Sequence, residues 1–595
     1  MPFSVRAQDG VLMLELDTPG SAINIFNRAT AEQLLEILAG VRPSNTRAIV
    51  FSTGKPNSFI NGVGLLLAHA SRTREDILRS AELPWAAYRA VHEAPVPTIA
   101  AIRGNCFGCG VEFALNCDYR IASDSAETQF YMTELNDYLF IPLFGSTWNL
   151  PEAVGLQSAI ELLLDGQRWT AETARDRGLI DVVARDEEIS RATDDFVRRI
   201  LDGEVVSGSR RRTVWGPQEE RALELGRNKV ANLPPVYHQV YGDALALLEG
   251  GARRKGGYLE HQRRELDRSA ASALSDIGKA AYSFFYLRQM AAERAAGRAR
   301  GVIDEPTVLA LTPELSDSAF AGDLLRRKVA GIRVIQGLEG DLRLNAADER
   351  SAPGSVAVRL GFASTVAGPA EIYAPAYRSS LRLLELATGD GAPEEETLAR
   401  LVRSLQRFGF EIARTRPHGT FLSNRLLFAY LRPLLRYLDG AEAPARIAAE
   451  LRTMGFVRRT DAVLHGCDLG AMARSLAPPL DWPVERVEAG LVLLAQPVEP
   501  AAAGDPVVGE ALCLSMLEVM LEARATRTVR DASIVDLIAR ELLDFPRHHC
   551  SLGAWLKIAR VRQALDAGAA VSRLVGDDTI QAGREMVAAG KEIYR

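Results

Sequence analysis

Apolar and polar positions near the start of the chain follow short, distinct patterns that predict separate elements. The N-terminus alternates toward Val11–Leu16 and predicts a hairpin. Val96–Ile102 is an apolar run typical of a short buried strand. The stretch from Gly104 to Gly110 breaks this pattern, and Val111–Leu115 opens a helix. A strand that enters a helix through a turn of small residues leaves unpaired N–H groups at the helix start, where negative charge is favoured.

The patterns change along the rest of the chain. Residues 190–300 predict helices with charged faces, and 272–287 predict one apolar helix. Thr307–Ala321 predicts a strand and then a helix, and the chain is again helical from 391 on. The sequence therefore predicts an α/β protein with much helix in its second half.

Size and composition narrow the class of protein. At 595 residues, the chain is too long for one core, and roughly three or four domains are expected. The net charge of −6 gives no broad basic face for nucleic acid. The sequence has no apolar stretch long enough for a membrane span, and its N-terminus does not resemble a signal peptide. Six cysteines in so long a chain favour a reducing cytoplasm.

Two carboxyls and two glycine-containing loops are the candidate chemistry. Glu112 follows the turn at Gly108–Gly110, Glu134 lies further on, and a second loop covers Phe59–Gly64. Two backbone N–H groups can hold a developing enolate oxygen, and two carboxyls can move protons to and from carbon and water. Glycine turns before helices are common, so on spacing alone a packing turn remains the alternative.

Cysteines near this turn raise the question of a metal site. Cys106, Cys109 and Cys117 lie close in sequence, but a second pair that would complete a tetrahedral set is missing. We therefore expect no metal.

Several motifs together resemble a known family. Pro95–Ser123, Ser58–Gly62, Gly155–Leu162 and Ala171–Asp181 resemble the crotonase (enoyl-CoA hydratase/isomerase) superfamily, and more narrowly the hydratase half of the multifunctional fatty-acid-oxidation alpha subunit. The resemblance spans roughly 1–190. It implies an N-terminal crotonase domain with the ββα spiral fold.

The resemblance also implies roles for individual residues. The N–H groups of Val63 and Cys109 correspond to the two oxyanion donors, and Glu112 and Glu134 correspond to the catalytic carboxyls. The implied reaction adds water across a 2-enoyl-CoA, with Glu112 orienting the water and Glu134 supplying the proton to carbon. Coenzyme A would be part of the substrate, and no permanently bound cofactor is expected.

Departures from the family pattern leave the substrate and the reaction open. The first loop has Gly62–Gly64 where the family usually has Gly-Ala-Asp, so a carboxylate is missing. The chain is also longer after Glu134. There Asn136, Asp137 and Tyr138 either face the acyl pocket, which would suit a polar or cyclic acyl group, or cap the inserted turn.

The resemblance extends into the second half in a degenerate form. It implies a helical extension or linker over 191–300, a truncated Rossmann-like remnant over 301–390, and two helical dehydrogenase C-terminal-like domains over 391–500 and 501–595. Two features of the dehydrogenase are missing from this sequence. Thr312–Leu315 stands where a glycine turn would cradle pyrophosphate, and Glu371–Pro375 lacks the family's histidine. We therefore expect no NAD binding and interpret Glu385 and Asn424 as packed remnants.

Three functions follow as hypotheses. The first is an acyl-CoA lyase that hydrates a 2-enoyl-CoA to a 3-hydroxyacyl-CoA, without dehydrogenase activity. The second is another crotonase reaction, either an isomerase or a C–C hydrolase acting on a cyclic or polar acyl-CoA. The third is a non-catalytic scaffold for a thiolase or a biosynthetic complex. A homodimer or a thiolase-like partner is compatible with these hypotheses.

Overall fold

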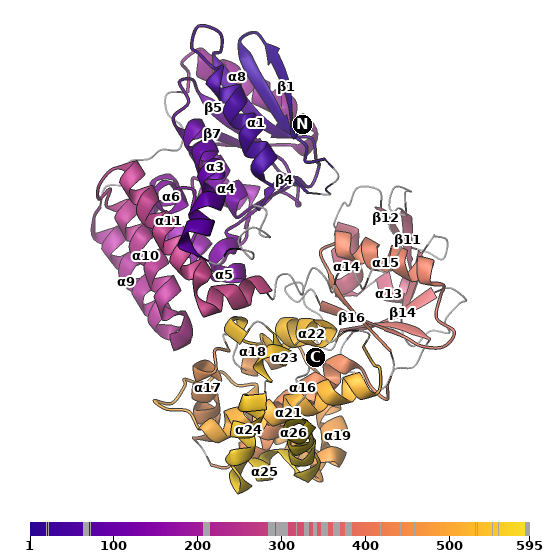
Figure 1. Ribbon diagram of the computed structural model, residues 1–595. Coiled ribbons are helices and arrows are strands. Elements are labelled where there is room, and N and C mark those ends of the chain that lie inside the picture. Colours follow the sequence, from indigo (N-terminus) through magenta and orange to yellow (C-terminus); the bar gives the residue numbers. More distant parts are fainter. Residues whose placement is uncertain are drawn as a thin grey trace. The chain divides into compact units, whose positions relative to one another are not determined.

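The computed structural model describes residues 1–589 apart from 20, 22, 63–70, 72, 206–214, 284–291, 293–294, 296–306, 317, 327–331, 337–341, 347–354, 361–368, 375–382, 417, 441, 457–459, 530, 532, 550 and 557. The chain forms two compact units (Figure 1). The first contains residues 1–233 and 237–282, and the second contains 234–236 and the residues from 283 on.

The predicted N-terminal hairpin is confirmed. β1 (Phe3–Gln8) pairs antiparallel with β2 (Val11–Leu16), and Gly10 turns the chain at φ +79°. These strands begin a six-stranded sheet of order β1-β2-β3-β5-β7-β10, whose remaining pairs are parallel. Its other strands are β3 (Ala48–Thr53), β5 (Thr98–Ile102), β7 (Tyr119–Ser123) and β10 (Val182–Ala184). The predicted buried strand is β5, all of whose residues are buried.

Helices cover both faces of this sheet. On one face α8 (Ile189–Leu201) packs Phe196 and Ile200 against strand residues that include Val50. Successive strand side chains point to opposite faces, so the neighbouring Phe51 faces the other side. There its ring meets Phe113 of α4 (Cys109–Asn116), with centroids 5.0 Å apart. Helices α1 (Arg28–Ala39) and α3 (Arg74–His92) contact each other, and α3 also contacts α4. Helix α4 is buried along its whole length because it fills this layer.

A second, smaller sheet has the order β4-β6-β8-β9. β4 (Ser58–Asn61), β6 (Asn105–Phe107) and β8 (Gln129–Tyr131) are parallel, and β9 (Trp169–Thr170) is antiparallel to β8. The carboxyl ends of parallel strands meet at the same edge of a sheet, which is where open α/β sheets bind ligands. β6 leads into α4, and β8 leads into α5 (Thr133–Tyr138).

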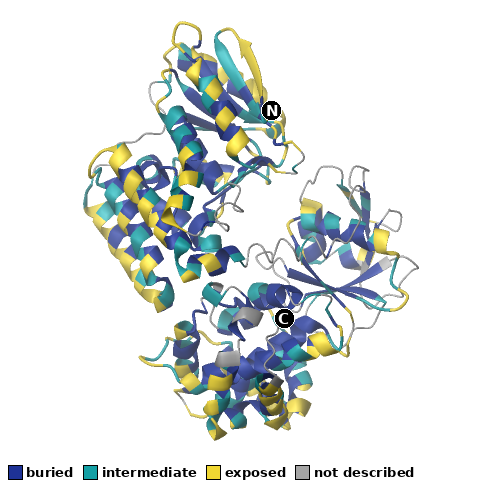
Figure 2. Cartoon of the chain, in the orientation of Figure 1, coloured by how far each residue is buried: buried dark blue, intermediate teal, exposed yellow. Residues whose placement is uncertain are grey.

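The first unit also contains the helices α6 (Ser146–Leu163), α9 (Pro217–Asn232), α10 (His238–Ala252) and α11 (Tyr258–Leu274). α10 contacts α6, α9 and α11, and α11 also contacts α3. Figure 2 shows buried residues on the inner sides of α9 and α10 and exposed residues on their outer sides. Helices α9, α10 and α11 thus share one packed unit with the N-terminal sheets.

The helix predicted over 272–287 is confirmed for the described residues on both sides of Ser275, but it is interrupted at Ser275. Helix α11 ends at Leu274, and Ser275 has an extended backbone at φ −62° and ψ 157°. Ser275 Oγ accepts a hydrogen bond from Gly278 N at 3.1 Å. A serine side chain that caps the next helical turn competes with continuation of the helix through it. Residues 284–287 of the predicted helix lie outside the described residues.

The second unit begins with a seven-stranded sheet of order β12-β11-β13-β14-β15-β16-β17, in which only β15 and β16 pair antiparallel among the described strands. The strands are β11 (Thr307–Leu311), β12 (Ile332–Gln336), β13 (Leu342–Ala346), β14 (Ser355–Leu360), β15 (Ala370–Ala374), β16 (Leu383–Thr388) and β17 (Glu411–Thr415). The predicted strand and helix near Thr307 are confirmed as β11 and α13 (Pro313–Ser316). α14 (Ala319–Arg326) and α15 (Glu395–Arg407) bury Phe320 and Leu401 in the core of this sheet.

The chain from 391 on is mostly helical, as predicted, but Glu411–Thr415 is a strand of the sheet and not helical. The helices after this strand are α16 (Leu422–Tyr437), α17 (Ala443–Thr453), α18 (Thr460–Leu464), α19 (Leu469–Leu480), α20 (Val484–Leu494), α21 (Pro506–Ala525), α22 (Ser533–Leu543), α23 (Leu552–Trp555), α24 (Ile558–Asp566), α25 (Ala569–Val575) and α26 (Asp577–Ala589). α21 contacts α16, α17, α24, α25 and α26. One hydrophobic core therefore contains side chains from both 391–500 and 501–595.

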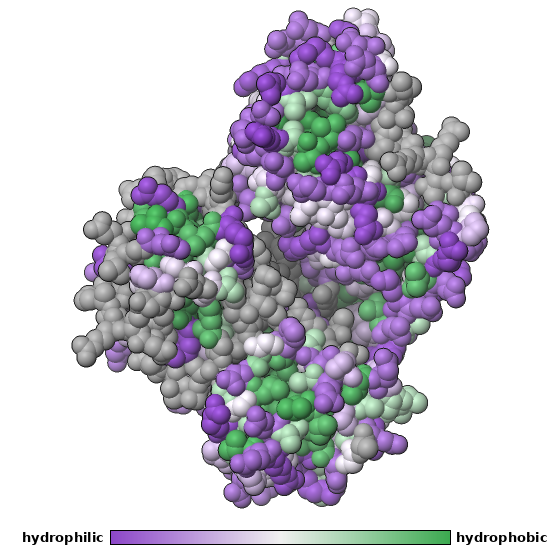
Figure 3. Space-filling model, turned by 180° about the vertical axis from the view of Figure 1, so that it is seen from behind, coloured by the Kyte–Doolittle hydropathy of each residue, from purple (hydrophilic) through white to green (hydrophobic). Residues whose placement is uncertain are grey.

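Polar residues dominate the visible surface, and apolar residues form separate patches in the view from behind (Figure 3). Within the described part of the chain, the search for a helix with the length and hydropathy of a membrane span found none.

Candidate active site

The small sheet brings the predicted site segments to one edge. Phe107, at the end of β6, pairs with both Asn61 of β4 and Tyr131 of β8. The chain then leaves β6 toward Cys109 and Glu112, and it leaves β8 toward Glu134. Residues more than 20 positions apart in sequence are therefore neighbours at this edge.

The turn between β6 and α4 requires glycine at two positions. Gly108 has φ +52°, and its N–H donates to Tyr131 O at 2.8 Å. A Cβ on Gly108 would lie 2.6 Å from Glu134 Oε1, and one on Gly110 would lie 2.1 Å from Ile60 O. The turn is thus pressed between β4 and the Glu134 carboxyl, with no space for larger side chains.

Cys109 is the first residue of α4, and its carbonyl oxygen is hydrogen bonded by a side chain of α3. Tyr88 Oη donates to Cys109 O at 2.9 Å. Among the described residues no acceptor is paired with the Cys109 N–H, as expected of a residue in the first helical turn. This amide is therefore available to a carbonyl oxygen.

Glu112 is almost completely buried, with a relative exposure of 1%. Its Oε1 accepts a hydrogen bond from Phe144 N at 2.8 Å. Burial raises the pKa of Glu112 well above its usual range, and the carboxylates of Glu134 and Glu265 raise it further. A raised pKa favours the neutral form of a carboxyl and makes its anion a stronger base.

Glu134 lies in the first turn of α5 and is also buried. Burial raises its pKa to about 8, and the nearby carboxylates of Asp137 and Glu265 contribute. No described residue donates a hydrogen bond to Glu134 Oε2. At pH 7 this group is therefore largely a neutral acid with one oxygen available, which suits a proton donor.

The other predicted donor, Val63, lies outside the described residues. The preceding residue, Gly62, is described. It has φ +110°, and its carbonyl accepts from Phe26 N at 3.0 Å. Gly62, the last described residue before Val63, therefore lies at the edge where β4 and β6 end.

The three polar residues inserted after Glu134 do not share one role. Asn136 Nδ2 donates to Leu163 O at 2.8 Å, and Asn136 Oδ1 accepts from Tyr241 Oη at 3.2 Å, so this residue fastens α5 to α6 and α10. Asp137 accepts from Tyr131 Oη at 3.0 Å. Tyr138 packs beside an apolar cluster that contains Phe140 and Tyr282. The Asn136 side chain thus bonds to two other helices, which is neither of the two predicted roles.

Sequence reasoning missed a set of polar side chains on α11. Glu265 is fully buried and accepts from Gly145 N at 2.6 Å, Thr147 N at 2.9 Å and Thr147 Oγ1 at 2.7 Å. Burial raises its pKa to about 7. Only a helical spacing marks this set in the sequence, and such a pattern is usually a solvated face.

The three cysteines near the turn are buried free thiols. Burial raises the pKa of Cys106 and of Cys109, which keeps both thiols protonated. A metal binds the thiolate form, so these two side chains are poor ligands in this environment.

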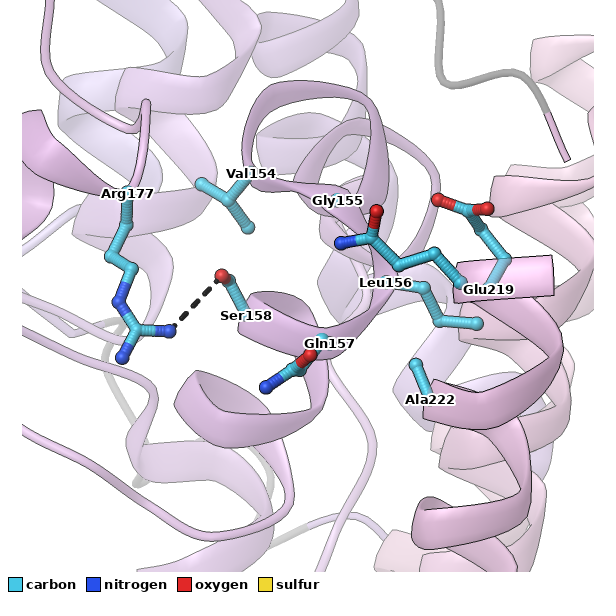
Figure 4. A pocket seen from close by; sticks show the side chains of 9 residues that line it. Val154, Gly155, Leu156, Gln157, Ser158, Arg177, Glu219 and Ala222 are labelled. Carbon is cyan, nitrogen blue, oxygen red and sulfur yellow. Dashed lines mark hydrogen bonds between the residues drawn. The ribbon is translucent and has the colours of Figure 1, made fainter. Parts of the chain in front are cut away.

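A separate hollow of about 250 Å³ lies at the kink of α6 (Figure 4). Gly155 breaks α6 there with φ +79° and ψ 162°, and the hollow extends to Glu219 of α9. Arg177 borders it and bonds to Ser158 and Glu161. Its lining contains neither Glu112 nor Glu134.

In the second unit, Glu385 and Asn424 are buried and hydrogen bonded. Glu385 accepts from Thr415 Oγ1, Leu422 N, Ser423 N and Ser423 Oγ at 2.6 to 2.8 Å. Asn424 Oδ1 accepts from Tyr373 Oη at 2.6 Å, and the Tyr373 ring stacks on Phe421. These contacts agree with the interpretation of Glu385 and Asn424 as packed residues that fasten α16 to the sheet.

Comparisons with known proteins bear on the first unit. Residues 6–207 match the family described as Enoyl-CoA hydratase/isomerase. A fatty acid oxidation complex subunit alpha from Aliivibrio fischeri is 27% identical over 356 residues, covering 57% of this chain and 49% of that protein. The same subunit from Shewanella loihica is 31% identical over 179 residues, covering 30% of this chain and 25% of that protein.

The chain spans about half, or less, of the length of these curated relatives. Among solved structures, an enoyl-CoA hydratase from Bacillus anthracis is similar at 24% identity and a TM-score of 0.32, covering 45% of this chain and 98% of that one. The N-terminal part of this chain, residues 6–207, is a crotonase-like domain that is similar to the enoyl-CoA hydratase/isomerase family.

Proposed function

We propose that the first unit hydrates a 2-enoyl-CoA to a 3-hydroxyacyl-CoA. One observation carries the proposal: two buried carboxyls, Glu112 and Glu134, stand with the Cys109 N–H at the edge where parallel strands end. Both have a raised pKa. Similarity to the family supports a thioester substrate, and the residue types support proton transfer at carbon.

The proposed steps use each group once. The thioester oxygen accepts hydrogen bonds from Cys109 N–H and, by resemblance, from Val63 N–H, which stabilises the enolate. Glu112, as carboxylate, accepts a proton from the water whose oxygen adds to C3. Glu134, as carboxylic acid, gives its proton to C2. The net change is one water added, and proton exchange between the two acids or with solvent restores the starting state.

The experiment is hydration of crotonyl-CoA and of longer 2-enoyl-CoAs, followed by loss of the conjugated thioester absorbance. Glu112→Gln and Glu134→Gln are expected to lose at least about 100-fold in kcat while coenzyme A binding stays intact. Glu172→Gln, on the exposed surface of α7 (Ala171–Asp176), is the matched control. Absence of turnover by the unaltered protein on every enoyl-CoA, with coenzyme A still bound, would exclude hydration.

Asp137 favours one second candidate, double-bond isomerisation. Its carboxylate lies near Glu134 and is held by Tyr131 Oη, so a further proton carrier stands beside the acid. Isomerisation moves a proton between two carbons and adds no water. Mass analysis of the product separates the reactions, because only hydration increases the mass by one water.

We also propose that the second unit does not bind NAD. Its sheet changes direction of progression at β11, where a dinucleotide would meet the turn after the strand. That turn has Pro313, which lacks an N–H, and Thr312 N already donates to Leu344 O at 3.0 Å. Calorimetric titration with NAD and NADH should therefore give no heat of binding, and a micromolar dissociation constant would contradict the proposal.

A further inference from the structure

Helix α11 buries an unusual polar face. Tyr258, His261, Gln262 and Glu265 follow the helical spacing of one face, and the last three are buried. The neighbouring Glu260 and Arg264 are exposed and pair with each other. Burying carboxyl, imidazole and amide groups costs free energy unless hydrogen bonds replace their lost hydration. The partners of these buried side chains therefore indicate the role of the inner face of α11.

The inner face of α11 binds the turn that also binds the Glu112 carboxyl. Phe144 N donates to Glu112 Oε1 at 2.8 Å, and the next amide, Gly145 N, donates to Glu265 Oε2 at 2.6 Å. Thr147 adds two more donors to Glu265, and its Oγ1 also lies 2.9 Å from His261 Nε2. Two consecutive amides thus bind two different carboxyls, so the same short segment holds both.

A second contact presses α11 against the same turn. Gly145 has φ +94°, and a Cβ there would lie 2.8 Å from Tyr258 Oη and 3.0 Å from Gln262 Nε2. Tyr258 Oη donates to Asn116 Oδ1 at 2.7 Å. Asn116 Nδ2 in turn donates to Glu112 O at 2.8 Å and to Phe144 O at 3.0 Å. Through Asn116, the helix is therefore linked to the backbone of Glu112 and to the carbonyl of Phe144, the residue whose N–H binds the Glu112 carboxyl.

We propose that Glu265 is a positioning residue for the reaction at Glu112, acting through the Phe144–Thr147 turn that both carboxyls share. The proposal rests on the proposed function for its effect on rate, but the link between the two carboxyls is a property of the protein itself. Helix α11 lies beyond residues 6–207, so the match to the family does not include it.

The charge of Glu265 gives the link between the two carboxyls a measurable effect on the pKa of Glu112. Glu265 interacts electrostatically with Glu112 on α4 and Glu134 on α5. His261 shares the Thr147 hydroxyl with Glu265 and lies near Arg264 and Arg254, and Arg254 pairs with Glu152 on α6. Tyr258 bonds to Gln262 on the same helix. Burial and the nearby Arg264 and Arg254 lower the pKa of His261 to about 4, so it is neutral at pH 7. The negative charge of ionised Glu265 raises the pKa of Glu112. Removing that charge should lower the pKa of Glu112.

The experiment compares Glu265→Gln with Glu260→Gln, an exposed glutamate on the same helix. Glu265→Gln is expected to lower kcat about 10- to 100-fold with KM changed by less than about threefold, because the substrate contacts remain. It is also expected to move the Glu112 limb of the pH profile to lower pH. Glu260→Gln should match the unaltered protein in both. Thr147→Ser should retain more activity than Thr147→Val, because serine keeps the hydroxyl donor to Glu265.

A second readout does not depend on turnover. The infrared band of protonated Glu112, identified by its loss in Glu112→Gln, can be titrated in the unaltered protein and in Glu265→Gln. If the unaltered protein hydrates no enoyl-CoA, the proposed function fails and this titration alone decides the inference. An unmoved Glu112 titration in Glu265→Gln would overturn the inference, even if kcat falls, because the role would then be structural only. If Glu265→Gln does not fold, the Glu112 titration is measured in Thr147→Val instead. An unmoved titration in that variant would overturn the inference.

Discussion

Gly108 is the position where one added methyl group should separate stability from catalysis. The change Gly108→Ala places a Cβ 2.5 Å from Thr133 Oγ1 and 2.6 Å from Glu134 Oε1, and it puts a side chain on a residue with φ +52° and ψ −118°. The backbone strain costs about 1–3 kcal/mol. The contact with Glu134 can be relieved by moving a flexible carboxyl, which costs little stability but displaces the proton donor.

Gly155→Ala is the matched control. Gly155 also combines a positive φ of +79° with an extended ψ of 162°, but nothing lies within 4 Å of its added Cβ. Both variants should lose about 1–3 kcal/mol of stability from strain. Only Gly108→Ala should lose catalysis, by about 100-fold in kcat, since a displacement on the order of 1 Å of a reacting group has that effect.

Two measurements on each variant decide the matter. Hydrogen exchange followed by mass spectrometry on peptides from β6 and α4 reports the stability of the first unit. The loss of enoyl-thioester absorbance reports kcat. If Gly108→Ala keeps a kcat within threefold of Gly155→Ala, the placement of Glu134 against the turn is wrong.

Three further outcomes follow from buried charged groups. Arg120 donates to the carbonyls of Leu179, Ala114 and Cys117, so Arg120→Met should destabilise the first unit by about 3 kcal/mol, seen as faster hydrogen exchange in α4. Glu385→Gln should destabilise the second unit by about 1–3 kcal/mol, because one carboxylate oxygen that accepts hydrogen bonds is lost; unchanged exchange in α16 would contradict this. The pKa of Glu134 in the folded chain, about 8, exceeds the unfolded value of about 4.3. The proton on Glu134 therefore stabilises the fold fully below pH about 4, and this contribution falls by up to about 1.4 kcal/mol per pH unit as pH rises to 8. Urea unfolding measures the free energy of unfolding of the first unit at pH 5 and pH 8, and the difference between the two values should be smaller in Glu134→Gln than in the unaltered protein.

The turn and the acids were accessible from sequence because each depends on local requirements. Glycine at 108 and 110 signals a backbone that other residues cannot adopt or that another chain segment touches, and both reasons apply here. The hairpin and β5 follow from apolar patterning, which a half-buried or fully buried strand imposes on its own residues. The break in the helix at Ser275 could not be predicted, because the apolar pattern continues through this residue while its side chain caps a new helical turn.

The sequence by itself determined the chemistry that is available: a turn with free amides at a helix start, followed by Glu112 and Glu134. The tertiary structure alone decided how those groups behave. Glu265 lies 153 positions after Glu112 in the printed sequence, and only the arrangement of α11 against the start of α6 brings its charge to the same turn. A glutamate on a helix is by default a solvated side chain. Burial, and the raised proton affinity that comes with it, arise from surrounding side chains that are distant in the sequence, so local sequence patterns cannot specify them.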